Sequence, residues 1–313
     1  MSRMSRPAAR ALDPAVLSAT RGLHFAARQI VAGVLPGIQA SRQPGLSREF
    51  SQYRAYQPGD EPRHIDWKLF ARSDRYYLRE SEIQTAVTVR LILDATESMR
   101  HEDTTGAGAG VRKFDCARVL AAAFAYLAHA QGDPVGLHAV SAGRVTSVQP
   151  GERRQPLERI IRALENLQPG GRWPSEAKEF GAALAAKGGA IPPRSTREIS
   201  VILTDGHEHG SEMRSALAPL RARQHEVLFV HLLGGDEVEF PFSGPVRFEE
   251  WETGRVFESD AAAVRSMWLE NQERHLAEWR RGWGGRDFEY VQFRTDEPLD
   301  RALRTYLLRR MKR

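Results

Sequence analysis

The sequence has a single cysteine in 313 residues and lacks a long apolar run. Cys116 alone cannot form a disulfide within the chain or build a cysteine metal cluster, which fits a reducing compartment. The longest apolar run, residues 119–128, falls well short of the roughly 20 residues that a membrane-spanning helix needs. Charged residues and a proline interrupt residues 8–17, so no secretory signal is expected there. These absences predict a soluble cytoplasmic protein without a membrane span.

Nucleotide-binding and hydrolase motifs are missing as well. No Gly-Lys-Ser or Gly-Lys-Thr sequence occurs, which excludes a Walker-type ATPase. Gly106, Gly108 and Gly110 lie about a dozen residues beyond the nearest predicted strand, too far along the chain for a dinucleotide fingerprint. No Gly-x-Ser-x-Gly elbow or other pairing of a nucleophile with a base stands out.

Positive charge is in excess only at the two ends of the chain. The formal net charge is +5, of which residues 1–48 carry +6 and residues 301–313 another +6, leaving −7 on residues 49–300. The sequence pI near 9.5 therefore argues poorly for nucleic-acid binding. Apolar residues interleave the basic end, which favours a terminal helix docked on the body over one that binds a membrane surface.

From residue 86 onward, β-branched runs alternate with helical patterns. The predicted strands are 86–93, 135–140, 144–148, 199–204, 227–233 and 288–294. The predicted helices are 112–131, 154–167, 175–186, 211–223, 260–281 and 297–310. This alternation predicts an α/β fold with a mostly parallel, doubly wound sheet and helices on both faces. The 135–140 and 144–148 strands should form an antiparallel hairpin at one edge.

The first part of the chain has a different pattern. Residues 15–34 predict a helix that Pro36 and Gly37 end. Residues 35–84 carry dense turn signals among aromatics and arginines and predict a small irregular or β segment. The expected organisation is thus an N-terminal region, 1–85, and an α/β domain, 86–313.

Polar residues follow two of the predicted strands. Asp94-Ala95-Thr96-Glu97-Ser98 ends the first strand, and Thr204-Asp205-Gly206 ends the 199–204 strand. Open α/β sheets bind ligands at the carboxyl ends of their strands, and a carboxylate with two hydroxyls suits Mg²⁺ or Mn²⁺. Either motif alone is more simply explained by an aspartate that caps the next helix. On neighbouring strands, the two together predict a site.

These residues resemble a known fold and, within it, one bacterial family. Asp94-x-Thr96-x-Ser98 with the later Asp205 resembles the metal-ion-dependent adhesion site of the von Willebrand factor A-like fold. The chain from about residue 40 to residue 310 resembles the domain of unknown function 58 family, most specifically between Tyr53 and Arg72. The residues that carry this likeness are Gly45, Glu49, Phe50, Arg54, Tyr56, Pro58, Gly59, Asp60, Arg63, Ile65, Asp66, Trp67, Ala71, Arg72, Glu82 and Asp94 to Met99.

The resemblance implies a protein-binding module rather than an enzyme. It implies a Mg²⁺ or Mn²⁺ shell whose coordination an acidic residue of the partner completes. Related proteins are often encoded beside MoxR-type AAA+ ATPases, so the implied role is an adaptor or co-chaperone that helps such an ATPase to mature or remodel a client complex. The implied metal shell is Asp94, Thr96, Ser98 and Asp205, and the expected partner-binding residues on the same rim are Glu97, Arg172 and His207.

One position departs from the pattern of the family. A Gly-Gly-Thr turn is expected where this chain has Gly170-Gly171-Arg172. If it points into the site, Arg172 would repel a metal ion and could pair with Asp94 or Glu97 instead. We therefore expect metal binding to be weakened or lost, while the surface stays a partner site.

Arginines and aromatics also interleave between residues 48 and 82. Proteins that bind single-stranded nucleic acid have this pattern, as do small folded platforms whose arginines pair with acids. Seven acidic residues match seven basic ones in this segment, which favours a platform that docks a partner. The expected partner-binding residues here are Arg54, Asp60, Arg63, Asp66, Trp67 and Arg72.

Two alternative functions stay open, nucleic-acid binding and a metal-dependent hydrolase or phosphatase. Aspartyl phosphatases use Asp-x-Asp, whose second acid protonates the leaving group, but Thr96 holds that position here. The His207-Glu208-His209 run could add imidazole ligands at the same rim. A solvated loop that opens a helix is the simpler explanation of that run.

Overall fold

The computed structural model describes most of the chain and divides it into two compact units. The described residues are 22–41, 51–57, 60, 62, 65–81, 87–104, 109–151, 154–174, 180, 198–208, 211–222, 226–249, 254–283, 288–299 and 303. One unit comprises residues 35–85, and the other joins residues 1–34 to residues 86–313. The expected boundary after residue 85 falls at this division, but the N-terminal helix groups with the α/β unit. Most of the predicted 175–186 and 297–310 helices lies outside the described residues.

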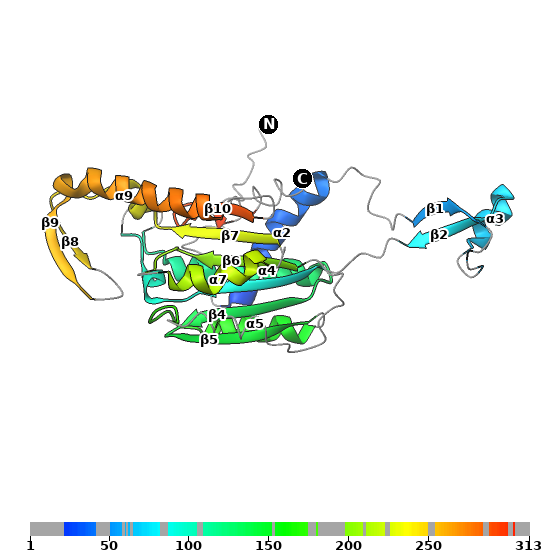
Figure 1. Cartoon of the computed structure of the whole chain (residues 1–313), viewed down its shortest axis with the longest axis horizontal. Coiled ribbons are helices and arrows are strands. Elements are labelled where there is room, and N and C mark those ends of the chain that lie inside the picture. Colours follow the sequence, from blue (N-terminus) through cyan, green and yellow to red (C-terminus); the bar gives the residue numbers. More distant parts are fainter. Residues whose placement is uncertain are drawn as a thin grey trace, which may run out of the picture. The chain divides into compact units, whose positions relative to one another are not determined.

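A six-stranded sheet covered by helices forms the larger unit (Figure 1). The strands are β3 (Thr88–Asp94), β4 (Val135–Ser141), β5 (Arg144–Gly151), β6 (Glu198–Thr204), β7 (Glu226–Leu233) and β10 (Phe288–Arg294). Their order is β10-β7-β6-β3-β4-β5, and every neighbouring pair is parallel except β4 and β5. The doubly wound α/β fold and its antiparallel edge hairpin are therefore confirmed.

The central strands are buried on both faces, as their continuous apolar runs predict. One face contacts α4 (Lys113–Ala130), beside which α5 (Arg154–Asn166) packs. The other face carries an apolar cluster with α7 (Glu212–Ala222) and the end of α9 (Ala261–Gly282). In this cluster the Phe229 ring stacks on Trp279 and Trp283, with centroids 5.0 and 5.5 Å away.

The N-terminal helix α2 (Leu23–Ser41) buries an apolar stripe that includes Ala27 and Ile30. His24 on this helix hydrogen bonds to the Tyr126 hydroxyl of α4, with Nε2 and Oη 2.6 Å apart. The helix continues through Pro36 and Gly37, so the prediction that it ends there was wrong. Proline has a helical φ, and its missing N–H costs the helix one backbone hydrogen bond. Here that loss does not end the helix. Within the described ranges, no helix is long and apolar enough to span a bilayer.

Three short elements between β7 and α9 were not predicted. They are α8 (Gly235–Glu239) and the antiparallel strands β8 (Pro245–Glu249) and β9 (Val256–Asp260). Because α8 follows the carboxyl end of β7, these elements lie at the edge of the sheet where the parallel strands end, as the orange hairpin in Figure 1 shows. Asp260 ends the hairpin and caps α9 by accepting a hydrogen bond from the Ala262 amide.

The smaller unit is a hairpin with a seven-residue helix between its strands. β1 (Ser51–Ala55) pairs antiparallel with β2 (Tyr77–Ser81), and α3 (Trp67–Ser73) lies between them in sequence. Asp66 caps α3 by accepting hydrogen bonds from the backbone amides of Lys68 and Leu69, at 2.9 and 3.0 Å. The Phe70 ring stacks on Tyr76 at 4.4 Å. A cluster of aromatic rings packs the helix against the residue that leads into β2.

Gly206 allows α9 to approach the end of β6 closely. Its φ is +71°, and an added Cβ would lie 2.8 Å from Trp279 Nε1 and 3.1 Å from His231 Nε2. We expect Gly206→Ala to lower the free energy of unfolding by about 2–4 kcal/mol, because backbone strain and overpacking add. Urea unfolding followed by circular dichroism measures the loss. Gly132→Ala is the control, since Gly132 has φ +79° but open space around it, and should lose only about 1 kcal/mol. Equal losses would contradict the packing argument.

Candidate functional site

The four residues expected to form a metal shell meet at the carboxyl edge of the sheet. β3 and β6 are neighbours, with Leu93 paired to Leu203, so the loops that follow them lie side by side. Thr96 Oγ1 donates to Asp94 Oδ1 at 2.7 Å, and its oxygen lies 3.2 Å from Ser98 Oγ. Ser98 Oγ donates in turn to Asp205 Oδ1 at 3.2 Å. All four side chains are buried and form one connected chain of hydrogen bonds.

Asp94 has donors on both of its carboxylate oxygens. Oδ1 accepts from the backbone N and the hydroxyl of Thr96, and Oδ2 accepts from Thr204 Oγ1 at 2.6 Å and Trp173 Nε1 at 3.0 Å. Burial and, after it, the charge of Asp205 raise the pKa of Asp94 to about 6, although these hydrogen bonds favour its charged form. With an exposure of 1%, Asp94 faces its own chain and not solvent.

The loop after α5 places Trp173 against Asp94. The Trp173 indole donates to Asp94 Oδ2, whereas the side chain of the preceding residue, Arg172, is exposed. The Gly170 amide donates to the Ala95 carbonyl at 2.9 Å, which fixes this loop against the one that follows β3. Trp173 then points inward, because its ring packs at 5.4 Å against Phe180 in the apolar cluster.

Glu97, on the same rim, forms an ion pair with Arg100, with Oε1 and Nε 3.0 Å apart. The expected pairing of Arg172 with Asp94 or Glu97 stays a prediction, whereas Asp94 accepts an indole hydrogen bond from Trp173. Arg172, at the position where a threonine was expected, has an exposed side chain.

Lys113, which the sequence analysis did not single out, lies between two carboxylates of the edge. Its Nζ is 2.8 Å from Asp205 Oδ2 and 2.9 Å from Glu237 Oε1, and its side chain is 1% exposed. Burial opposes the charged ammonium, but Asp205 and Glu237 outweigh it and raise the pKa of Lys113. In return, Lys113 holds the pKa of Asp205 below its ordinary value and lowers that of Glu237 to about 2, although burial works against both charges. All three groups are charged at neutral pH.

The oxygen donors at this edge do not fit Mg²⁺ or Mn²⁺ as they are arranged. Mg²⁺ requires about six oxygen ligands in octahedral positions. Here the hydroxyls of Thr96 and Ser98 bond to Asp94 and Asp205, and the Lys113 ammonium fills the space between Asp205 and Glu237. A divalent cation would have to displace that ammonium.

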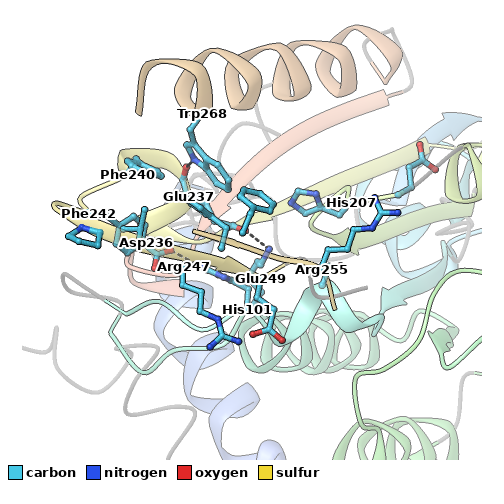
Figure 2. A pocket seen from close by; sticks show the side chains of 17 residues that line it. His101, His207, Asp236, Glu237, Phe240, Phe242, Arg247, Glu249, Arg255 and Trp268 are labelled. Carbon is cyan, nitrogen blue, oxygen red and sulfur yellow. Dashed lines mark hydrogen bonds and ion pairs between the residues drawn. The ribbon is translucent and has the colours of Figure 1, made fainter. Parts of the chain in front are cut away.

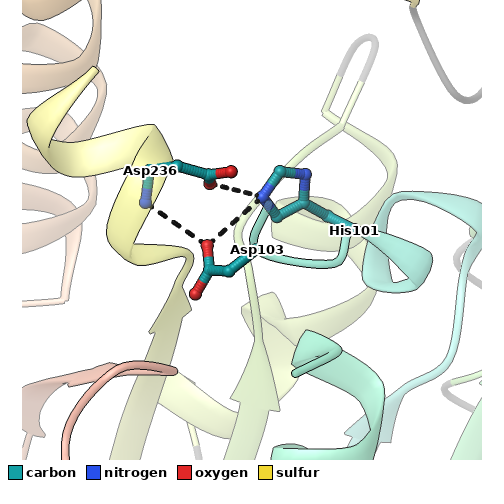
Figure 3. Close-up of side chains that lie close together, drawn as sticks. All are labelled: His101, Asp103 and Asp236. Carbon is teal, nitrogen blue, oxygen red and sulfur yellow. Dashed lines mark hydrogen bonds and ion pairs between the residues drawn. The ribbon is translucent and has the colours of Figure 1, made fainter. Parts of the chain in front are cut away.

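A second acidic cluster lies next to this edge (Figure 3). Among the described residues, His101, Asp103 and Asp236 place ligand atoms within 4.8 Å of one another, close enough to hold a metal ion. His101 Nε2 is 2.8 Å from Asp236 Oδ1 and 3.7 Å from Asp103 Oδ1. Burial disfavours the charged ring, but hydrogen bonds to both carboxylates raise the pKa of His101 to about 9. The amide of Gly235 also donates to Asp103, and that of Thr104 to Asp236, so the cluster joins the 101–104 loop to α8.

The histidines near Asp205 do not converge like metal ligands. His207 is exposed and stacks on His275 at 5.3 Å. His231 is buried between the Asp205 carbonyl and the Tyr290 hydroxyl, and burial lowers its pKa to about 3. Glu208 accepts hydrogen bonds from two amides at the start of α7, which agrees with the simpler interpretation of the 207–209 run. His209 lies outside the described residues.

The expected partner residues of residues 35–85 belong to the smaller unit and serve it locally. Asp60 accepts a hydrogen bond from the Gln57 amide at 2.8 Å, and Asp66 caps α3. Trp67 is 59% exposed, and Arg72 is exposed in the last turn of α3. The side chains of Arg54 and Arg63 lie outside the described residues. Their role toward a partner stays a prediction.

A cavity of about 970 Å³ opens beside the acidic edge (Figure 2). Ser98, Lys113 and His207 contribute to its polar part. Its apolar wall comes from five aromatic residues of the α8–β8 loop, the hairpin and α9, which are Phe240, Phe242, Phe248, Phe257 and Trp268. Phe248 stacks on Trp268 at 5.9 Å and on Phe257 at 5.5 Å. The wall therefore runs from Phe240, which is fully buried, to Phe257, which is 60% exposed.

A family model described as "Protein of unknown function DUF58" matches residues 52–278. This chain belongs to the DUF58 family. The uncharacterized proteins Rv1480 of Mycobacterium tuberculosis (strain ATCC 25618 / H37Rv) and Mb1516 of Mycobacterium bovis (strain ATCC BAA-935 / AF2122/97) are each 28% identical to it over 287 residues, covering 91% of this chain and 86% of theirs. The membership of the DUF58 family predicted from the sequence is thus confirmed.

Solved structures similar to this DUF58 protein include a von Willebrand factor A domain. The conserved hypothetical protein BatB from Bacteroides thetaiotaomicron shares 13% identity and a TM-score of 0.44, covering 73% of this chain and 100% of that one. The SpRpn10 VWA domain shares 11% identity and a TM-score of 0.38, covering 70% of this chain and 94% of that one. The fold of the DUF58 chain itself is the doubly wound, mostly parallel α/β sheet described above.

Trp173→Phe tests the neutral donor on Asp94. The folded-state pKa of Asp94, about 6, exceeds the ordinary 3.8, so its ionisation costs stability as the pH rises through this window. Without the indole N–H this pKa rises further. Trp173→Phe should therefore lose more unfolding free energy at pH 8 than at pH 5, by about 1 kcal/mol or more. Urea unfolding at both pH values measures it.

Trp279→Phe is the matched control, because its indole donates to the Gly206 carbonyl, which does not titrate. Its loss should be similar at the two pH values. A Trp173→Phe loss that does not change with pH would contradict the role assigned to this indole.

Proposed function

We propose that this DUF58 protein is a non-enzymatic, cytoplasmic adaptor or co-chaperone that binds a partner protein at the carboxyl edge of its sheet. It works with a MoxR-type AAA+ ATPase that matures or remodels a client complex. The resemblance of Asp94, Thr96, Ser98 and Asp205 to a metal-ion-dependent adhesion site, and their meeting at one edge of the sheet, favour an interaction module. The observation that carries the proposal is the cavity, which joins the charged edge to an exposed aromatic surface.

The exposed aromatic residue at the rim of this cavity fits a protein partner. Phe257, on β9, lines the cavity and is 60% exposed. We call the side of the hairpin that carries Phe257 the hairpin face. Exposed apolar side chains that gather beside a polar rim are typical of protein interaction sites. A partner that inserts an apolar side chain along Phe257 would bury both this face and the aromatic wall behind it.

Asp94 is a poor candidate for the nucleophile of a hydrolase or phosphatase. Each of its oxygens accepts two hydrogen bonds, which uses the lone-pair positions of the carboxylate. Thr96 holds the position of the general acid, and its hydroxyl donates to Asp94. A group that is 1% exposed and fully bonded within its own chain is not arranged to attack a substrate.

Affinity purification of the tagged, full-length protein from its native cells tests the partnership. We expect a AAA+ ATPase and a client complex to be enriched and identified by mass spectrometry. Recovery of nucleic acid or of a small phosphorylated metabolite in place of an ATPase would contradict the proposal. A tagged, unrelated protein of similar charge controls for non-specific capture.

Phe257→Ser tests the hairpin face. Loss of a buried aromatic anchor costs about 2 kcal/mol of binding, so the recovered partner should fall by about tenfold or more. Phe25→Ser is the matched control, because Phe25 is similarly exposed, at 56%, on α2. Equal recovery with both variants would show that the hairpin face is not the docking surface.

A further inference from the structure

We infer that the Lys113 ammonium is the resident cation of the acidic edge, so that the chain binds no Mg²⁺ or Mn²⁺ there. The inference rests on position. Nζ lies within 2.9 Å of a carboxylate oxygen of Asp205 and of Glu237, at the edge where Asp94, Thr96 and Ser98 also meet. It concerns the chain alone and does not depend on which protein binds it.

The placement of Lys113 would be unfavourable without these carboxylates. Lys113 is the first residue of α4, and the positive end of a helix dipole disfavours a cation. Its side chain is 1% exposed, so water compensates little of its charge. The two short ion pairs provide the compensation of the ammonium charge that water does not. The backbone hydrogen bond from the Lys113 amide to the His101 carbonyl, at 3.0 Å, fixes the start of the helix beside the edge.

The same geometry leaves no position for a second cation. Asp205 Oδ2 and Glu237 Oε1 bind the ammonium, and Glu237 Oε2 accepts from the Gly234 amide at 2.8 Å. Asp205 Oδ1 accepts from Ser98 Oγ and from the His207 amide. Asp205 Oδ2 and Glu237 Oε1 become available to a divalent cation only when the ammonium is removed.

Lys113→Ala should therefore create a metal site. It removes the ammonium, leaves space, and exposes Asp205 and Glu237 to each other without a counter-charge. The probe is Mn²⁺, and the free ion is counted by electron paramagnetic resonance. Mn²⁺ binding is measured for each chain with Asp205 and again with Asp205→Asn, and the second value is subtracted from the first. Ions held at His101, Asp103 and Asp236 contribute to both values and therefore cancel.

We expect this difference to be near zero for the wild-type chain and near one ion for Lys113→Ala, whose affinity should exceed that of the wild type by about tenfold or more. Mn²⁺ should also raise the melting temperature of Lys113→Ala and leave that of the wild type unchanged. A wild-type chain that binds one Asp205-dependent ion at sub-millimolar concentration would overturn the inference. So would a folded Lys113→Ala that gains none.

Circular dichroism shows whether Lys113→Ala folds. Folding that Mn²⁺ restores supports the inference, since the ion then replaces the lost charge. If the variant stays unfolded with and without Mn²⁺, the wild-type titration decides, because it needs no variant of Lys113. Failure to recover an ATPase would leave these metal measurements unchanged, so the two proposals fail separately.

Discussion

The carboxyl edge of the sheet depends on one buried ammonium. Lys113 connects the start of α4 to Asp205, 92 residues away in sequence, and to Glu237, 124 residues away. These contacts join the helix on one face of the sheet to the loop after β6 and to α8. A buried ion pair adds little stability by itself, but loss of one partner leaves an uncompensated charge, at a cost of about 3–5 kcal/mol. The arrangement of the edge thus requires all three charges together.

The edge satisfies its carboxylates in two different ways. Asp205 and Glu237 are compensated by charge, whereas Asp94 is held by neutral donors from Thr96, Trp173 and Thr204. Burial disfavours the charge of both aspartates, but only Asp205 has a cation beside it, and the charge of Asp205 also acts on Asp94. The pKa of Asp94 accordingly rises to about 6 while that of Asp205 falls. The two aspartates that the sequence placed in one metal shell therefore behave oppositely.

Periodicity predicted the sheet and the meeting of Asp94 with Asp205, because strand ends follow from local patterns. It could not place Trp173, since one residue of loop register decides whether Arg172 or Trp173 points inward. A signal for Lys113 was present, because it shares the helical face of Ala117 and Leu120, which are fully buried. The hairpin β8–β9 was missed because its strands are short and its side chains alternate only weakly between partly buried and exposed.

The hairpin face and the charged edge are parts of one packed structure. Phe257 stacks on Phe248, which stacks on Trp268, and the Trp268 indole donates to the Glu237 carbonyl at 2.9 Å. The Glu237 side chain in turn binds Lys113. A partner that reorients Phe257 therefore acts on a series of packed residues whose last member is Lys113. A metal-dependent site would instead place its cation in direct contact with the partner. In the proposed complex the aromatic wall makes the contact, and the buried charges keep the backbone beneath it in place.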